Sequence, residues 1–298
     1  FRSQDYYVVP TTTASLRLYC NTSLLQQVTG SPKPPESFEE LIDTCQKIHA
    51  YSLQRGGGII PIVSCYGSDA ITGAYLVPFT AKFEPELDVD LDGANSIIEC
   101  YRGWKLGLVD AKTPAIQAYW EAMKLGCDQM QTGFSSMDRQ QAQFQFVNGN
   151  AAFMATGSWD ARGTFLAAGK KGIAIQLIDW PLPKPEGKYS QYIAGRANEA
   201  AAMGGGPYGI YKSSQHKALA LDFMHYLTSV VGNEKFNRLA EWPPIIIGAK
   251  PVDIMKPFMP NPIGFTSRMN FQIGTRVRTI FISESIRYLQ GEESLADF

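Results

Sequence analysis

The clearest structural signal lies in the middle of the chain, where residues 146–159 read FVNGNAAFMATGSW. A helix is predicted over about residues 138–146, and the small and apolar residues 151–155 then predict a short buried strand. Trp159 follows this strand almost at once. In an α/β sheet, ligands gather beyond the carboxyl ends of strands. The stretch therefore predicts such a sheet, with a candidate site directly after this strand.

The segment of residues 37–64 supports the same fold class. Ser37 with Glu40 three positions later is the pattern of a capping box, and apolar residues recur at helical spacing as far as Ile48. The glycines at 56–58 end this helix, and the apolar run at 59–64 has the length of a strand. Helix, glycines and strand in succession predict an α/β fold.

Further elements extend the pattern to both ends of the chain. Strands are predicted over residues 6–9 and 16–19 on either side of a threonine-rich bend. Apolar periodicity assigns Trp104 and Trp120 to the core. Helices are predicted to begin at Asp92, at Thr113-Pro114, at Ser213 or Ser214 (ending after Val231) and near Asn270 (ending before Gly291). A second short helix, which carries Phe236 and Leu239, is predicted after Gly232.

The composition excludes several classes of protein. A length of 298 residues favours two domains or one large discontinuous domain. The chain holds 27 basic and 28 acidic residues, a formal net charge of −1, so it lacks the basic surface that nucleic-acid binding requires. Charged residues make up 18%, below the usual ~25%, which argues against a disordered chain. No apolar run approaches the ~18 residues of a membrane-spanning helix.

Residues that could carry catalysis or bind a metal are few. Only three histidines are present, and no protease, esterase or P-loop motif is found. The cysteines form no Cys-x-x-Cys pair, which excludes zinc and thioredoxin-like spacing, and we expect them to be small buried hydrophobes. They stand at Cys20, Cys45, Cys65, Cys100 and Cys127.

One glycine motif matches a nucleotide-binding fingerprint only formally. Gly204, Gly206 and Gly209 satisfy G-x-G-x-x-G, but Pro207 lies inside the motif and a strand-like segment, 208–211, follows it. A dinucleotide fingerprint must instead open a helix. We therefore predict a backbone bend that serves as a hinge, because glycine accepts many backbone conformations.

Three loops each place an aromatic ring beside side chains that form hydrogen bonds. A flat apolar face next to polar groups suits a sugar, which has apolar C–H faces and a rim of hydroxyls. These loops contain Trp159, Asp160 and Arg162; Tyr66, Ser68 and Asp69; and Trp242.

The order of several segments resembles the family 1 extracellular solute-binding proteins of ABC transporters. In this family a strand pair, a Pro-x-x-W-E-E-L helix start, an F-x-x-G-K-A-A-M…G-x-W stretch and a return strand with a helix and a proline loop follow one another. The matching segments here are residues 7–10 with 18–21, 34–41, 146–154 with 157–159, and 208–228 with 239–244.

The resemblance implies an α/β, two-lobed periplasmic-binding-protein fold (type II) with discontinuous lobes and a hinge. Family members carry further residues before the first of these strands, and the chain starts on Phe1 rather than Met, so we expect an N-terminally incomplete first lobe. The implied domains are 1–11 as the hinge-entering strand, 12–203 as lobe 2, 204–250 as a lobe 1 segment, and 251–298 as the return to lobe 2.

By resemblance, the protein captures a carbohydrate, a mono- or oligosaccharide, outside the cytoplasmic membrane and delivers it to the permease of an ABC importer. The resemblance implies a monomer without cofactor or metal, in the periplasm or outside the cell, with a lipoprotein anchor before processing as a further option. Trp159 matches the family's aromatic that stacks on a sugar. The implied ligand-binding residues are Trp159, Asp160, Arg162, Tyr66, Ser68, Asp69, Arg196, Asn198, Glu199 and Trp242.

Two other functions remain open at this point. The same fold could bind a polyamine, a phosphate ester or a peptide. A glycan-processing enzyme needs two carboxylates ~5–9.5 Å apart, and Asp69 with Asp160 is the pair to examine.

Overall fold

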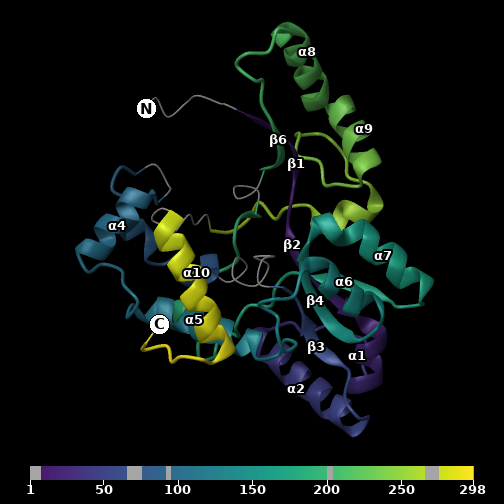
Figure 1. Cartoon of the computed structure of the whole chain (residues 1–298), viewed down its shortest axis with the longest axis vertical. Coiled ribbons are helices and arrows are strands. Elements are labelled where there is room, and N and C mark those ends of the chain that lie inside the picture. Colours follow the sequence, from purple (N-terminus) through teal and green to yellow (C-terminus); the bar gives the residue numbers. More distant parts are fainter. Residues whose placement is uncertain (1–7, 66–75, 92–94, 200–203, 266–274, 298) are drawn as a thin grey trace.

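The computed structural model describes residues 8–65, 76–91, 95–199, 204–265 and 275–297 (Figure 1). Strands and helices alternate through most of this chain, as an α/β fold requires. Within these ranges, no helix combines the length and the apolar character that crossing a membrane demands.

A mixed four-stranded sheet forms the centre of the molecule. The strand order is β3 (Ile60–Val63), β4 (Ala151–Gly157), β2 (Leu16–Asn21) and β5 (Ile175–Ile178). β3 and β4 run parallel, whereas β2 is antiparallel to both β4 and β5. Every residue of β4 is buried, because this strand is central and both faces of the sheet are covered.

Helices cover both faces of this sheet. We call the sheet and these helices together the body. Successive side chains of a strand point to opposite faces, so Leu18 and Cys20 lie in one core and Tyr19 in the other. The first core is closed by α1 (Thr22–Thr29) and α2 (Phe38–Gln54), and the second by α6 (Arg139–Val147), α7 (Ala161–Lys170) and η6 (Asp253–Phe258).

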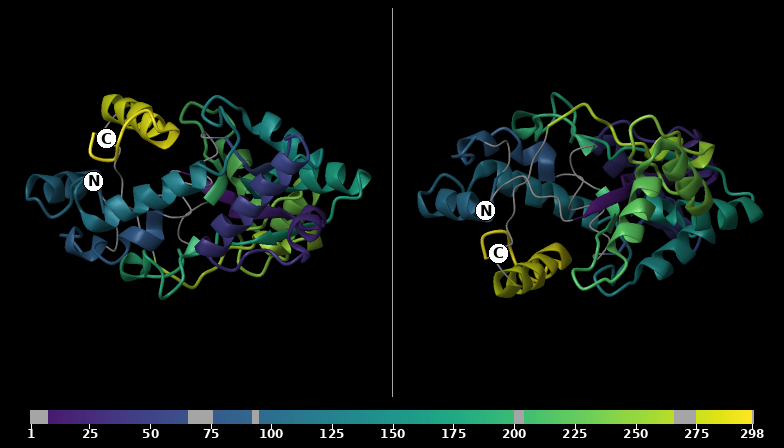
Figure 2. Two further views of the ribbon diagram at one scale, coloured as in Figure 1. Left: turned by 90° about the horizontal axis from the view of Figure 1, so that it is seen from below. Right: turned by 90° about the horizontal axis from the view of Figure 1, so that it is seen from above.

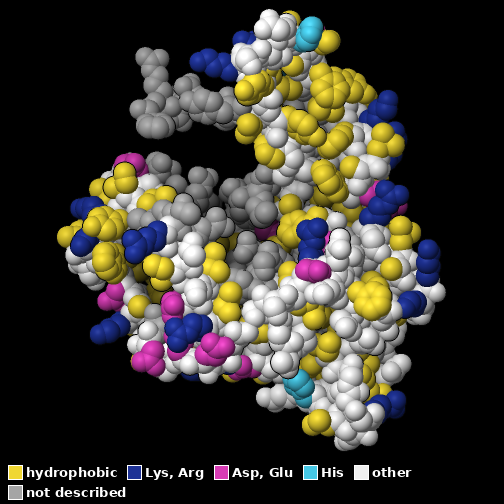
Figure 3. Space-filling view, in the orientation of Figure 1, with side chains coloured by type: hydrophobic (Ala, Val, Ile, Leu, Met, Phe, Trp, Pro, Cys, Tyr) yellow, Lys and Arg dark blue, Asp and Glu magenta, His cyan; other side chains and the backbone are white. Residues whose placement is uncertain are grey.

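The part of the molecule at the top of Figure 1, which we call the arm, contains a second sheet. Its strands β1 (Val9–Thr13) and β6 (Gly204–Tyr208) are antiparallel. They are followed by α8 (Lys217–Thr228) and α9 (Val230–Ala240). Figure 3 shows hydrophobic side chains gathered on the surface of this arm. Leu219, Phe223 and Val231 are among the exposed large hydrophobic residues.

Polar side chains fasten α9 and the loop after it to β1. The buried amides of Asn233 and Asn237 donate to the carbonyl oxygen of Thr11, at 2.8 and 3.1 Å. The hydroxyl of Thr12 donates to the carbonyl of Pro243 at 2.6 Å. The arm therefore depends on buried hydrogen bonds more than on a thick apolar core.

The first core continues into a third part, the flank, on the side of the molecule away from α7 (Figures 1 and 2). The hydroxyl of Tyr288 on α10 lies 3.5 Å from the carbonyl oxygen of Trp120 on α5. The flank comprises η2 (Glu84–Glu86), α4 (Ile97–Lys105), α5 (Pro114–Cys127), η4 (Ser190–Tyr192) and α10 (Thr275–Gln290).

Several predicted boundaries were wrong. The threonines after Val9 form a strand rather than a bend, because β1 pairs with β6. β6 itself ends at Tyr208, so the predicted strand over 208–211 is not present. The helix predicted as far as Val231 ends at Thr228, and the second helix already begins at Val230, because the side chain of Ser229 caps it by accepting from the N–H of Gly232 at 3.1 Å.

Two predictions about the flank were also wrong. Ser96, not Asp92, caps α4. Trp120 is 4% exposed, as predicted, but Trp104 is 53% exposed and belongs to the surface. The prediction for the cysteines is confirmed, since all five are buried. Burial raises the pKa of the Cys127 thiol to about 12, which keeps it protonated and unreactive.

Candidate functional site

The candidate site lies where β4 ends. β4 stops at Gly157, the turn η3 (Ser158–Asp160) follows, and α7 begins at Ala161. The N–H of Ser158 donates to the carbonyl of Ser15 at 3.0 Å, and the hydroxyl of Tyr19 donates to the carbonyl of Gly157 at 2.9 Å. The turn that carries Trp159 is therefore fixed by the connection between β1 and β2.

Trp159 is half-buried, and its ring lies against the backbone of Gly157. A Cβ atom at Gly157 would collide with three atoms of the indole ring. Gly157 thus makes room for the ring itself. Gly163, the second flanking glycine, faces the side-chain amide of Gln143, with 3.2 Å between the position of a Cβ and Nε2. The indole is held in one place while part of its surface remains accessible.

Asp160 is buried, and both of its carboxylate oxygens have partners inside the body. The hydroxyl of Thr156 donates to Oδ2 at 2.5 Å, and Nε of Arg139 lies 3.4 Å from Oδ1. Burial raises the pKa of the Asp160 carboxyl, while the Thr156 hydroxyl and the Arg139 charge oppose that rise. With these partners, Asp160 fixes the turn after β4 from the inside.

Arg162 links the body to the loop that follows α9. Its Nε lies 3.4 Å from a carboxylate oxygen of Glu241, the residue before Trp242. Trp242 is 38% exposed, and its ring packs edge to face on Phe236 with 6.2 Å between the ring centroids. The ion pair thus brings Arg162 and the residue before Trp242 together at the junction of body and arm.

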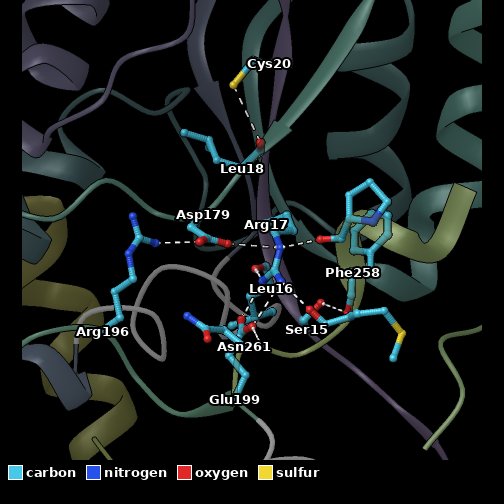
Figure 4. Close-up of polar contacts among 12 residues, drawn as sticks. Ser15, Leu16, Arg17, Leu18, Cys20, Asp179, Arg196, Glu199, Phe258 and Asn261 are labelled. Carbon is cyan, nitrogen blue, oxygen red and sulfur yellow. Dashed lines mark hydrogen bonds and ion pairs between the residues drawn. The ribbon is translucent and has the colours of Figure 1, made fainter. Parts of the chain in front are cut away.

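Arg196 and Glu199 belong instead to a network around Arg17, a residue that we did not single out from the sequence (Figure 4). The guanidinium of Arg17 is buried and donates to both carboxylate oxygens of Glu199, at 2.6 and 3.1 Å. Its Nε lies 3.3 Å from Asp179, which also pairs with Arg196 at 2.6 Å. The signal in the sequence was a lone charge between Leu16 and Leu18 in a strand.

The same network ties the segment after η6 to the body. Arg17 donates to the carbonyls of Pro257 and Met259 at 2.9 and 3.2 Å. Glu199 accepts from the N–H of Asn261 at 2.8 Å, and the N–H of Asn198 donates to the carbonyl of Phe265 at 2.9 Å. These contacts give Arg17 and Glu199 a structural role at the crossing between segments that are distant in the sequence.

Tyr66, Ser68 and Asp69 lie outside the described residues. The chain before them is well fixed, since the hydroxyl of Ser64 donates to the carbonyl of Ala155 at 3.1 Å. β3 and β4 are parallel, so their carboxyl ends reach the same edge of the sheet. Figure 3 shows the surface hollowed between arm and flank.

A family comparison identifies the kind of protein. Residues 2–255 match the family described as bacterial extracellular solute-binding protein. No curated protein sequence matches the chain.

Solved structures share the fold at low sequence identity. A chitin oligosaccharide binding protein is 17% identical with a TM-score of 0.62, and the match covers 98% of this chain and 68% of that one. A family 1 extracellular solute-binding protein from Bifidobacterium longum subsp. infantis is 18% identical with a TM-score of 0.61, covering 100% and 72%. The sugar-binding protein MalE from Xanthomonas citri is 17% identical with a TM-score of 0.60, covering 100% and 69%. These matches confirm the predicted α/β periplasmic-binding-protein fold.

Proposed function

The chain belongs to the bacterial extracellular solute-binding protein family, and we propose that its solute is a carbohydrate delivered to the permease of an ABC importer. The observation that carries the proposal is the Trp159 indole, held on Gly157 at the carboxyl end of β4 with part of its face accessible. Proteins of the same fold include the chitin oligosaccharide binding protein and one in complex with raffinose.

The chemistry of the ring fits this class of solute. A sugar offers apolar C–H faces for stacking, and an aromatic side chain provides a large contact area with few rotatable bonds. Because Trp159 is already held in place, little side-chain entropy is lost when a ligand binds. Tyr66, Ser68 and Asp69 follow β3 at the same edge of the sheet, and they are the proposed hydrogen-bonding partners of the hydroxyls.

The remaining candidates divide into two groups. Arg162 and Trp242 lie at the junction of body and arm and are proposed to contact the ligand. Asp160 is proposed as a positioning residue, because Thr156 and Arg139 already engage its carboxylate. The partners of Arg196, Asn198 and Glu199 favour a role in holding the hinge region.

The proposed lobes follow the division into body and arm. Lobe 2 comprises residues 12–203 and 251–298, while 204–250 belongs to lobe 1, and 1–11 enters the hinge. β1 and β6 cross between the lobes, and closure around the ligand is a hinge motion. The protein acts outside the cytoplasmic membrane as a monomeric receptor that releases its solute unchanged, anchored as a lipoprotein before any processing.

A thermal-shift screen tests the class of solute. At a ligand concentration one hundred times its Kd, binding stabilises the folded protein by about 2.7 kcal/mol, which raises the melting temperature by several degrees. We expect such a shift with at least one mono-, di- or trisaccharide, raffinose and chitin oligosaccharides included. Shifts with only spermidine, a sugar phosphate or a tripeptide would contradict the proposal. Conversion of a sugar during the incubation would indicate an enzyme.

A further inference from the structure

A second cluster of polar residues lies in the flank, apart from the Trp159 site. Asp88 and Asp90 follow η2, and Glu99 lies in the first turn of α4. One carboxylate oxygen from each residue lies within 4.8 Å of the others. Like charges at this separation repel one another, and a cation between them relieves the repulsion.

The sequence around this cluster carries an independent signal for a particular ion. Residues 88–99 read DVDLDGANSIIE, which fits the twelve-residue calcium loop D-x-D-x-D-G-x₅-E at each of its specified positions. In that loop, positions 1, 3 and 5 and a final Glu at position 12 supply ligands, and the Gly at position 6 permits a sharp turn. Asp92 and Gly93 lie outside the described residues, so their part in the pattern comes from the sequence alone.

The described part of the loop has the form that the pattern requires. α4 begins at Ile97, the tenth position of the pattern, which places Glu99 in its first turn. The buried side chain of Asn95 donates to the carbonyl of Glu84 at 3.2 Å and joins the loop to η2. This contact holds the middle of the pattern against η2.

Backbone N–H groups hold the carboxylate of Glu99 in place. Its carboxylate oxygens accept from the N–H groups of Ser96 at 2.8 Å and Val89 at 2.7 Å. A carboxylate held by backbone donors therefore lies beside Asp88 and Asp90.

We propose that Asp88, Asp90 and Glu99 bind a calcium ion through their carboxylates. Ligands that are all oxygen favour a hard cation, and the described cluster offers neither the thiolate nor the imidazole that zinc or copper prefers. Calcium accepts six to eight oxygen ligands in a flexible arrangement, as a loop of this length provides, whereas magnesium demands a near-ideal octahedron. The bound ion joins the end of η2 to the start of α4, remote from the Trp159 site.

Terbium luminescence and calorimetric titration of the full chain, freed of metal with a chelator, test this site. Terbium replaces calcium in such loops, and Trp104 and Tyr101 on α4 can transfer excitation energy to it. We expect calcium to displace terbium and to bind with a Kd of about 10⁻³ M or tighter, the range of extracellular calcium modules. Magnesium is expected to bind more weakly than calcium.

Substitutions locate the ion. Asp88→Asn, Asp90→Asn and Glu99→Gln should each weaken calcium binding at least about tenfold, since even indirect partners of a metal contribute that much. Asp253→Asn is the matched control, because this exposed carboxylate pairs with Lys256 on η6 and should leave calcium affinity unchanged. Asp90 is exposed, so Asp90→Asn keeps the fold, and its melting curve in chelator verifies this.

Three results would each overturn the proposal. The first is that no calcium binds at concentrations up to about 10 mM, which is ten times the weakest expected Kd. The second is that Asp90→Asn and Glu99→Gln leave the calcium affinity unaltered, and the third is that magnesium binds as tightly as calcium. Carbohydrate binding measured in chelator is independent of all three, so the failure of one proposal leaves the other intact.

Discussion

The body and the arm are built by different means. In the body, β4 is buried along its whole length, and apolar side chains from both faces of the sheet pack around Phe153 and Met154. In the arm, two strands and two helices leave large apolar side chains exposed, and the amides of Asn233 and Asn237 fasten them to Thr11. The body is therefore a rigid support for the turn that carries Trp159, and the arm is the part able to move.

The largest expected effect contrasts one phenylalanine from each region. Phe153→Ala leaves a cavity in the centre of the sheet and should lower the free energy of unfolding by about 3–5 kcal/mol. Phe223 on α8 is 58% exposed, so Phe223→Ala should change it by no more than about 0.5 kcal/mol. Urea denaturation of both variants measures the two changes in the free energy of unfolding. Equal losses would mean that the arm is packed as tightly as the body.

The elements of the body could be predicted because their signals are local. Ser37 caps α2 as its position before Glu40 indicated, with 3.2 Å between its Oγ and the N–H of Glu40. The apolar run of β4 is continuous, and Trp159 follows it directly, so the place of Trp159 in the fold could also be predicted. A strand buried on both faces reads as such a run in any sequence.

The errors fall where distant residues decide the outcome. The threonines of β1 become a strand because they pair with β6, and Thr13 lies opposite Gly204. Arg17 has its partner Glu199 at a separation of 182 residues, which no local pattern reveals. Trp104 lies at helical spacing, but periodicity does not say whether another element covers that face of the helix.

An intermediate effect is expected from the amides that fasten the arm. Asn237→Ala leaves the buried carbonyl of Thr11 with one donor fewer and should lower the free energy of unfolding by about 1–3 kcal/mol. Hydrogen exchange should become faster in β1 and β6 while β2 and β4 stay protected. Asn148→Ala is the control, because this amide donates to Phe144 at the exposed end of α6. Uniform loss of protection over both sheets would contradict independent motion of the arm.

The smallest effect concerns the ion pair between body and arm. Both partners are partly exposed, so Arg162→Ala should lower the free energy of unfolding by no more than about 1 kcal/mol, and by less in high salt. Lys47→Ala, which removes an exposed pair within α2, gives the reference value by chemical denaturation. A loss of several kcal/mol specific to Arg162 would show that this contact, rather than the amides, holds the arm.

The central claim is that Trp159 is the main contact for a carbohydrate, and calorimetric titration of Trp159→Ala with the sugar that gives the largest thermal shift tests it most directly. Removal of an aromatic anchor from a binding site costs about 2 kcal/mol or more, which corresponds to about thirtyfold weaker binding. We predict this loss of affinity for Trp159→Ala and unchanged affinity for Trp104→Ala, whose ring is exposed on the flank. Without sugar, the melting temperature of Trp159→Ala should fall less than that of Phe153→Ala. Normal sugar affinity in Trp159→Ala together with a strongly lowered melting temperature would show instead that Trp159 is a core residue and that the carbohydrate site lies elsewhere.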